Sequence, residues 1–249
     1  MYRISIITVV KNNAQTIKDA IDSVLSQTYQ NIEYIVIDGG STDGTVEIIN
    51  GYKEKIDILI SEPDYGIYDA MNKGIKEASG DIIGFLNSDD MYNDEHVLNR
   101  IYEVFAKTKV DIVYGDLVYV EKSNTSKIIR YWKAGEYKKG AFKRGWHPPH
   151  PSFFVKKEIY EKYGLFDLDY RIAADYELML RFIEKYRIKT VYIQNLLVKM
   201  RTGGESNRSV ANIIKANIES YKAWKKNGLS VFPFFIIMKP LRKILQLFR

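Results

Sequence analysis

The first 90 residues alternate short apolar runs with segments in which apolar residues recur at helical spacing. The apolar runs lie at 4–10, 34–37, 57–60 and 81–86. Between the first two runs, Ile17, Ile21 and Val24 fall on one face of a helix. This alternation predicts βαβ units, and hence an α/β fold with a mostly parallel central sheet flanked by helices. In such sheets, ligands bind beyond the carboxyl ends of the strands, so the residues that follow each run are candidate site residues.

The second half of the chain has shorter candidate strands. Those at 111–114, 117–121 and 127–131 predict a small second sheet, mixed or antiparallel. Further along, the pattern predicts a helix at 176–186, a strand at 190–193 and a last long helix at 207–224. The 249 residues suffice for one domain, from 1 to about 228, followed by a tail from 229 to 249.

The composition narrows the function classes. The chain has no cysteine, which excludes a disulfide framework, a thiolate zinc site and a cysteine nucleophile. Its net charge of +6 makes phosphate-bearing substrates, anionic membranes and nucleic acid candidate partners. Outside the tail the basic residues are scattered and form no nucleic-acid motif, so we expect no nucleic-acid role. The chain opens on a strand pattern and has no apolar run near the ~18 residues of a spanning helix, so we expect a cytoplasmic location.

Four small polar residues follow the run at 81–86: Asn87, Ser88, Asp89 and Asp90. They would be costly if buried without partners, but at a strand end that faces a crevice they can meet a divalent cation. Mg²⁺ and Mn²⁺ prefer oxygen ligands, and Mg²⁺ typically takes one or two carboxylates plus substrate phosphates. The pattern therefore favours a Mn²⁺ or Mg²⁺ site that holds a diphosphate. The alternative is a turn or a helix cap, since Asn, Ser and Asp favour both.

A second polar turn follows the run at 34–37. Asp38 ends the run, and Gly39 and Gly40 after it would let a ligand approach the backbone. The turn lacks the G-x-G-x-x-G spacing of a dinucleotide fold and follows the second strand instead of the first. We expect Asp43 to cap the next helix and Asp38 to contact a ligand.

The stretch 62–74 is dense in polar and aromatic residues at a strand-to-helix junction, where a helix N-terminus favours anions. Asp64 is a candidate ligand of a nucleotide-sugar in this stretch. Lys73 is either a phosphate ligand or a solvated helix lysine.

Further candidates lie in the second half. Asp175 begins a helix, either as its N-cap or as a general base that deprotonates an acceptor hydroxyl. Glu177, in the first turn, suits the helix dipole and is a candidate acceptor or diphosphate contact. His147 and His150 lie in a proline-rich loop, but no further nitrogen or sulfur ligand completes a zinc site. A phosphate or acceptor contact is expected for His150.

Five segments in this order resemble the inverting GT-A glycosyltransferases of family 2. They are SIITVVKNN at 5–13, SVLSQTY at 23–29, DGGSTDGT at 38–45, NSDD at 87–90 and ADYE at 174–177. The resemblance covers about residues 1–226, and the stretches 62–74 and 150–154 resemble a bacterial subgroup that builds O-antigens, capsules and exopolysaccharides. It implies a GT-A fold and transfer of a sugar from a nucleotide-diphosphate sugar to a lipid-linked saccharide acceptor. A UDP-sugar is the first expectation for the donor.

The resemblance also implies roles in donor binding. Thr8 and Val10, at the end of the first strand, are expected to line the nucleotide pocket. Asp38 is expected to hydrogen-bond the base, with Gly40 and Asp64 nearby.

Two further roles follow from the same resemblance. Asp89 matches the metal-binding carboxylate of the D-x-D motif, whose first position is Asn87 here, and it is open whether Asp90 joins Asp89 at the metal. Asn87 and Ser88 are expected donor contacts. Asp175 matches the catalytic base, which implies a single displacement that inverts the anomeric carbon.

Two other function classes stay open. A nucleotidyltransferase would need a glycine-rich basic phosphate loop after the first strand, and residues 11–13 do not provide one. A catalytically weak assembly subunit with a transferase fold would not need the intact set of Asp38, Asp89, Asp90 and Asp175.

The tail combines apolar and basic residues. Beyond Pro240, one helical face would collect Leu241, Ile244, Leu245 and Phe248, with basic residues at other positions. This pattern is typical of an interfacial helix on anionic lipid, and the alternative is packing on the domain or on a partner subunit. We expect peripheral contact with the cytoplasmic face of the inner membrane.

Overall fold

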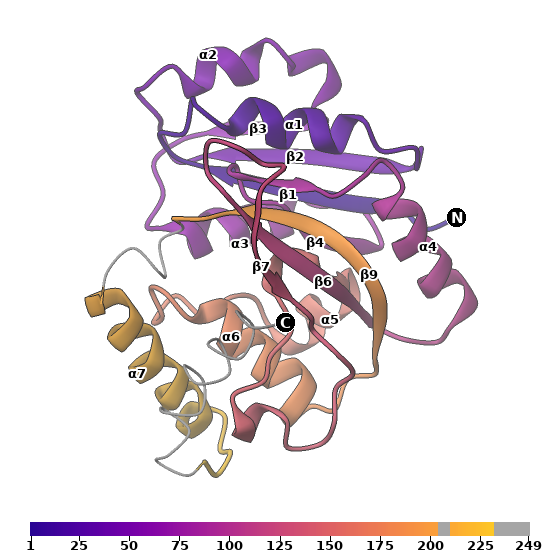
Figure 1. Ribbon diagram of the computed structural model, residues 1–249, viewed down its shortest axis with the longest axis vertical. Helices are drawn as coiled ribbons and strands as arrows, with labels where there is room; N and C mark the ends of the chain where they lie inside the picture. Colours follow the sequence, from indigo (N-terminus) through magenta and orange to yellow (C-terminus); the bar gives the residue numbers. More distant parts are fainter. Residues whose placement is uncertain (204–209, 232–249) are drawn as a thin grey trace.

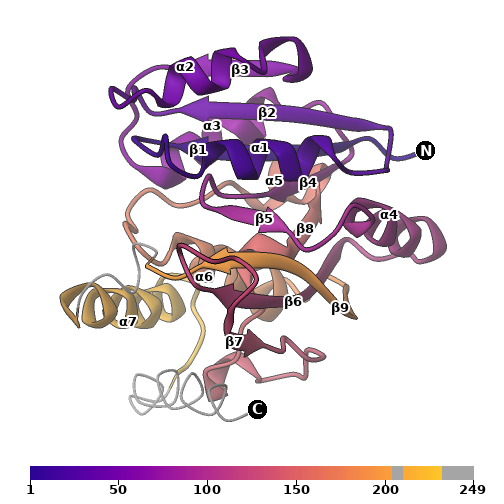
Figure 2. The same cartoon turned by 45° about the horizontal axis from the view of Figure 1, so that its top comes forward.

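A curled mixed sheet covered by helices forms the part of the chain that the computed structural model describes, residues 1–203 and 210–231 (Figures 1 and 2). Within those residues the sheet has nine strands in the order β3-β2-β1-β4-β8-β6-β9-β5, and β7 pairs with β6. The strands are β1 (Ile4–Val10), β2 (Ile32–Asp38), β3 (Ile58–Ser61), β4 (Ile82–Phe85), β5 (Asp90–Tyr92), β6 (Ile112–Val120), β7 (Ile128–Trp132), β8 (Phe153–Lys156) and β9 (Thr190–Arg201). The helices are α1 (Ile17–Leu25), α2 (Thr45–Asn50), α3 (Ile67–Glu77), α4 (Val97–Lys107), α5 (Lys157–Tyr163), α6 (Ala174–Met179), the π-helix η4 (Leu180–Lys185) and α7 (Val210–Lys226).

The first half is the predicted parallel sheet. β3, β2, β1 and β4 pair in parallel, with α1 and α2 on one face and α3 on the other (Figure 1). Side chains of β1 alternate between the two faces: Ile4 and Ile6 join the hydrophobic cluster under α1, while Ile7 and Val9 join the cluster under α3. Both faces are therefore covered, which is why these strands read as mainly apolar runs.

The strands of the second half extend this sheet, so the predicted small second sheet is a curled continuation of the first. β8 pairs antiparallel with β4 and with the first part of β6. β9 pairs in parallel along the whole of β6, and β7 pairs antiparallel with its last part. Register shifts between β6 and β9 fall between Tyr114 and Leu117. Irregularities of this kind bend a strand and increase its twist. The predicted runs 111–114 and 117–121 are therefore one bent strand, which carries the sheet around the curl. The predicted α/β fold class is confirmed.

Several elements differ from the prediction. β9 spans twelve residues, where a strand was expected only at 190–193, because residues 194–201 mix polar with apolar side chains. β5 is a three-residue strand that begins inside the acidic cluster, at Asp90. The helices α4 and α5 were not predicted.

The helix α7 closes the described part of the chain. Trp224 is fully buried, and its Nε1 donates a hydrogen bond to the Tyr176 hydroxyl of α6 at 2.9 Å. Leu229 and Val231, at the start of the predicted tail, pack against the same core cluster. The predicted tail helix beyond residue 231 lies outside the described residues. Among the helices described, none is both long and apolar enough to cross a bilayer.

Candidate active site

Polar loops after β1, β2 and β4 meet at one edge of the sheet. The register of β1 and β2 pairs Val10 with Asp38, so both strands end together. The Asn13 side-chain amide donates to the Ser88 hydroxyl at 2.9 Å, and the Thr16 hydroxyl donates to the Ser88 carbonyl at 2.9 Å. Asp38 and the 87–90 cluster therefore lie at the same edge of the sheet.

Asp38 is fully buried and organises the turn that follows β2. Its carboxylate accepts the backbone N–H of Gly40 and Ser41, each at 3.1 Å, and the hydroxyl of Ser61 at 2.7 Å. Gly40 adopts a φ of +77°, in the left-handed region that favours glycine. A base contact by Asp38 stays a prediction, and the structure gives this carboxylate a role in shaping the loop.

Thr8 and Val10 lie inside the core. Thr8 is fully buried and accepts a hydrogen bond from the Tyr34 hydroxyl at 3.1 Å, while Val10 is 4% exposed within the α1-side cluster. Their predicted lining of the nucleotide pocket stays a prediction.

The turn after Asp43 is close to the predicted cap. The N-cap of α2 is Gly44, and the Asp43 carboxylate accepts the N–H of Thr45 at 3.1 Å. Asp43 thus supports the start of α2 from one position before the cap.

Asp64 reaches over the glycine turn. A Cβ at Gly39 would lie 2.1 Å from Asp64 Oδ2, so only glycine allows this approach. The other Asp64 oxygen accepts the Gly66 N–H at 2.9 Å. Asp64 therefore lies beside the turn where its predicted ligand would bind.

Lys73 is engaged within the protein. Its Nζ lies 2.7 Å from Glu62 Oε1 and 3.8 Å from Asp69 Oδ2, and it donates to the Pro63 carbonyl at 3.1 Å. The hydrogen bond with Glu62 raises the pKa of Lys73. Lys73 thus fixes the 62–66 loop, and the predicted phosphate contact would require this ion pair to break.

The acidic cluster contains buried polar atoms without partners. Asn87 Nδ2 donates to Asp90 Oδ2 at 3.0 Å, but Asn87 Oδ1 and Asp90 Oδ1 have no hydrogen-bond partner among the described residues. Burial raises the pKa of Asp89, and burial together with the Asp89 charge raises the pKa of Asp90 well above its usual range. Unpaired buried oxygens are costly, and a divalent cation is a partner that would satisfy them. The donor set therefore fits Mn²⁺ or Mg²⁺.

The protein alone does not complete such a metal site. No group of three His, Asp or Glu side chains that could hold an ion occurs in the described ranges. Mg²⁺ sites with one or two carboxylates usually take their remaining ligands from substrate phosphates and water. The cluster therefore fits a cation that arrives with a diphosphate.

Arg201 is a member of this site that sequence reasoning missed. It lies at the end of β9, is 5% exposed, and donates from Nη1 to the Asp89 carbonyl at 2.9 Å. Its other Nη forms an ion pair with Asp19 of α1. The predicted strand at 190–193 stopped too early to bring residue 201 to the cluster.

A pocket of about 150 Å³ opens beside the cluster and contains the predicted base. Asn87, His150 and Asp175 line it, together with Ile67, Tyr68, Met71, Pro151, Arg171, Ile172 and Met200. The Tyr68 hydroxyl donates to Asp175 Oδ1 at 3.2 Å and to the Ile172 carbonyl at 2.8 Å. The Tyr68 hydroxyl is an uncharged donor to Asp175, because burial raises the pKa of Tyr68 well above its usual range.

His150 forms one wall of this pocket. Its ring stacks on Phe85 at 5.3 Å and meets Phe166 edge-on. Burial lowers the pKa of His150, and the nearby Asp175 charge opposes this only in part. His147 contacts Trp132 and Tyr176 and is not among the residues that line the pocket.

Glu177 is not among the residues that line this pocket, and its predicted substrate contact stays a prediction. It is 2% exposed, pairs with Arg181 at 3.0 Å, and accepts a hydrogen bond from Asn227 at 2.9 Å. Two residues along an α-helix correspond to about 200°, so Glu177 points away from the side that Asp175 occupies.

Glu219 of α7 holds the loop before Asp175 and was also missed. Its buried carboxylate accepts the N–H groups of Arg171, Ile172 and Ala173 at 3.2, 2.9 and 2.9 Å. Arg171 and Ile172 line the pocket, and Asp175 follows two residues after Ala173. Nothing local in the sequence pairs a helix residue with a loop 46 residues earlier.

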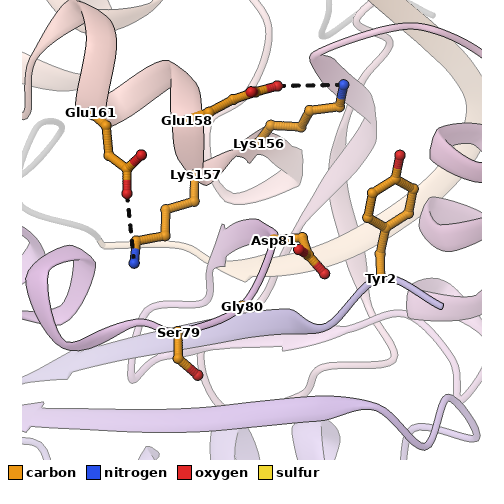
Figure 3. Close-up of a pocket in the computed structure, with 8 residues that line it drawn as sticks. All are labelled: Tyr2, Ser79, Gly80, Asp81, Lys156, Lys157, Glu158 and Glu161. Atoms are coloured by element: carbon orange, nitrogen blue, oxygen red, sulfur yellow. Dashed lines mark ion pairs between the residues drawn. The ribbon is translucent and has the colours of Figure 1, made fainter.

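A second pocket of about 320 Å³ lies at the opposite edge of the sheet, before β1 and β4 (Figure 3). Its lysines pair with its glutamates: Lys156 with Glu158 at 3.7 Å and Lys157 with Glu161 at 3.7 Å (Figure 3). Asp81 accepts the Arg3 N–H at 2.7 Å. The pocket beside Asp175, which adjoins unpaired buried oxygens, is therefore the better candidate for chemistry.

Comparison with known proteins shows the family of this chain. Residues 5–164 match the family model described as Glycosyl transferase family 2. The chain belongs to glycosyl transferase family 2. This glycosyltransferase is 30% identical over 211 residues to a PGL/p-HBAD biosynthesis glycosyltransferase of Mycobacterium bovis, which covers 83% of this chain and 80% of the relative. It is 35% identical over 186 residues to an uncharacterized glycosyltransferase of Mycobacterium tuberculosis, over 72% of this chain and 68% of the relative.

Solved structures share the fold of this glycosyltransferase. S. aureus TarS 1–349 in complex with UDP-GlcNAc has a TM-score of 0.68 at 14% identity, over 90% of this chain and 65% of TarS 1–349. The mannosyltransferase PcManGT of Pyrobaculum calidifontis, in complex with GDP-Man and Mn²⁺, has a TM-score of 0.67 at 19% identity, over 98% of this chain and 70% of that chain. The predicted GT-A fold is confirmed.

The buried His150 ring predicts a pH dependence of stability. Burial lowers its pKa in the folded state, so its stabilising contribution is present above the unfolded-state value of about 6.5 and is lost as the pH falls toward the folded value. Between about pH 7.5 and pH 5, urea unfolding of the wild type should lose up to ~1.4 kcal/mol per pH unit more than that of His150→Gln. His96→Gln, whose parent side chain is 52% exposed, is the control. Equal pH slopes for the wild type and His150→Gln would contradict the prediction.

Glu219→Gln should destabilise the pocket loop. An amide presents one acceptor oxygen to three N–H groups, so buried donors are left unpaired at a cost of about 1–3 kcal/mol. Urea denaturation measures this loss. The control is Glu103→Gln, a surface residue paired with Lys107, which should change stability by less than about 0.5 kcal/mol. The same small effect in both variants would show that Glu219 does not anchor the loop.

Proposed function

We propose that this family 2 glycosyltransferase transfers a sugar from a nucleotide-diphosphate sugar to a hydroxyl acceptor, with the aid of Mn²⁺ or Mg²⁺ and with inversion at the anomeric carbon. One observation carries the proposal: Asn87 of the acidic cluster and Asp175 line the same pocket. The pocket thus joins the expected diphosphate end of a donor to a carboxylate that can take a proton.

The donor diphosphate would lie against the acidic cluster. Asp89 would hold the cation, and the unpaired oxygens of Asn87 and Asp90 offer further ligands or orient its water. When bound, the cation supplies Lewis-acid stabilisation of the leaving diphosphate. Hydrogen bonds from Asn13 and Thr16 to Ser88 would keep the loop in place when the cation and the diphosphate bind.

Asp175 would act as the general base. Its carboxylate takes the proton of an acceptor hydroxyl, and that oxygen attacks the anomeric carbon from the face opposite the diphosphate. The bond from the anomeric carbon to the diphosphate breaks, and its electron pair leaves with the diphosphate. The Tyr68 hydroxyl at 3.2 Å orients the carboxylate, and the neutral ring of His150 closes the pocket without competing for the proton.

Similar proteins support the substrate class. TarS has been solved with UDP-GlcNAc, and PcManGT with GDP-Man and Mn²⁺. A relative that is 30% identical to this chain is described as a PGL/p-HBAD biosynthesis glycosyltransferase. We propose a nucleotide-sugar donor, a UDP-sugar first among them, and a lipid-linked saccharide acceptor in bacterial surface polysaccharide synthesis. The acceptor would be met at the cytoplasmic face of the inner membrane, with the tail as one peripheral contact.

Asp175→Asn should abolish transfer while donor binding is retained, because the amide keeps the shape of the side chain but cannot take a proton. The expected loss of turnover is about 10²–10⁴-fold. Release of nucleoside diphosphate measures turnover, and calorimetry measures donor affinity. Asp169→Asn, at a carboxylate that is 81% exposed, is the matched control. Unchanged turnover, or loss of donor binding, would contradict the role of Asp175.

A thermal-shift screen with Mn²⁺ against UDP, GDP, dTDP and CMP compounds should identify the donor base. A ligand at 100 times its Kd stabilises the native state by about 2.7 kcal/mol. In Asp89→Asn the Mn²⁺-dependent part of the shift should disappear, and in Asp169→Asn it should persist. Absence of any nucleotide-dependent shift in the wild type would overturn the proposed donor class.

A further inference from the structure

The helix α7 exposes an apolar stripe to solvent. Ile214 is 55% exposed and Ile218 is 47% exposed, and Tyr221 and Lys225 follow at helical spacing. Lys225 Nζ lies 4.9 Å from the centre of the Tyr221 ring. We name these four residues the α7 face. A contiguous apolar stripe on the surface of a helix is a feature of interaction sites.

The charged residues that α7 itself exposes are all basic. Lys215 and Lys222 are exposed and lie along one side of the isoleucine stripe, and Lys226 pairs with the acidic residues Asp167 and Asp169. The one acidic residue in α7, Glu219, is 7% exposed and faces inward to the pocket loop. An apolar centre with flanking lysines is the pattern of a helix that lies in a lipid interface, with its cations at the headgroups.

We infer that the α7 face binds an anionic lipid surface. Charge complementarity favours this occupant over two others. The segment 232–249 contains Lys239, Arg242, Lys243 and Arg249 and no acidic residue, so it would bring like charge to the face. A second copy of α7 would also bring its own lysines. Anionic headgroups instead attract each lysine near the surface.

The location of α7 gives this contact a consequence for the enzyme. In both views α7 lies on the side of the molecule to which the arrow of β2 points, which is the side of the candidate site (Figures 1 and 2). The buried side of the helix, through Glu219, holds Arg171 and Ile172 at the pocket. A membrane on the α7 face would therefore lie near the pocket and could present a lipid-linked acceptor. That last step rests on the proposed function, whereas lipid binding itself does not.

Vesicle flotation of the full-length protein tests the inference. The probes are vesicles of phosphatidylcholine with about one-third phosphatidylglycerol and vesicles of phosphatidylcholine alone. Ile214→Ser/Ile218→Ser should weaken binding to the anionic vesicles by about tenfold, because two apolar side chains no longer enter the interface. Lys215→Ala/Lys222→Ala should weaken the same binding by about tenfold and leave binding to pure phosphatidylcholine unchanged.

The matched control is Ile128→Ser/Ile129→Ser, which makes the same change at exposed isoleucines of β7, 56% and 46% exposed. This control should float like the wild type. Circular dichroism and thermal melts should show that all variants fold, since the changed side chains are exposed. Equal flotation of the Ile214→Ser/Ile218→Ser variant and the wild type would overturn the inference.

Two other outcomes would assign the face to another occupant and also overturn the inference. A wild-type dimer that the Ile214→Ser/Ile218→Ser change converts to a monomer, seen by analytical ultracentrifugation, would assign the face to a second copy. Faster tryptic cleavage after Arg242 or Lys243 in that variant, without vesicles, would assign it to the tail.

The measurement is separate from the proposed function. Flotation needs neither donor nor turnover, and Asp175→Asn should float like the wild type. Hydrolysis of a nucleotide-sugar in solution with Mn²⁺ should be unchanged in Ile214→Ser/Ile218→Ser. Loss of lipid binding with retained hydrolysis therefore supports the α7 face, and absence of hydrolysis in the wild type counts against the proposed function alone.

Discussion

The parallel pairing of β1 with β2 on one side and β4 on the other is the constraint on which the site depends. Parallel strands end at the same edge, so the loops after all three must share that edge. Side-chain hydrogen bonds from Asn13 and Thr16 to Ser88 then join the first loop to the third. The position of the acidic cluster is thus a result of sheet topology, and the loops add only its final orientation.

The cluster illustrates a conflict between stability and function. Asp90 is fully buried with one oxygen unpaired, and Asp89 beside it also loses hydration. A domain built for stability alone would not keep two carboxylates there. The surroundings reduce the free-energy cost of burying these carboxylates without removing it. The charge of Arg201 opposes the rise in the pKa of Asp89 and Asp90, and the Asn87 amide donates a hydrogen bond to one Asp90 oxygen. The oxygens that remain unpaired could be satisfied by a cation that binds together with a diphosphate.

Sequence reasoning located the residues whose position follows from a strand or helix end. Asp38 and Asn87 follow strands, and Asp175 begins a helix, so periodicity alone was enough to place them. It failed where a residue depends on a distant partner, as Glu219 does on a loop 46 residues earlier. Periodicity also separates Glu177 from Asp175, because two residues along a helix nearly reverse the direction of the side chain. The curl of the sheet was missed because bent β6 looks like two strands.

Arg201 has a consequence for the order in which the enzyme is made. Arg201 contacts Asp89, which lies 112 residues earlier in the sequence, and Asp19, which lies 182 residues earlier. The acidic cluster is therefore supported by residues from both ends of the domain. During synthesis the N-terminal strands emerge first, and native-like pairing of β1, β2 and β4 can form before β9 exists. The acidic cluster then lacks both its guanidinium and the strand that pairs with β5. A ribosome-bound chain therefore has no complete acidic cluster until residue 201 has left the exit tunnel.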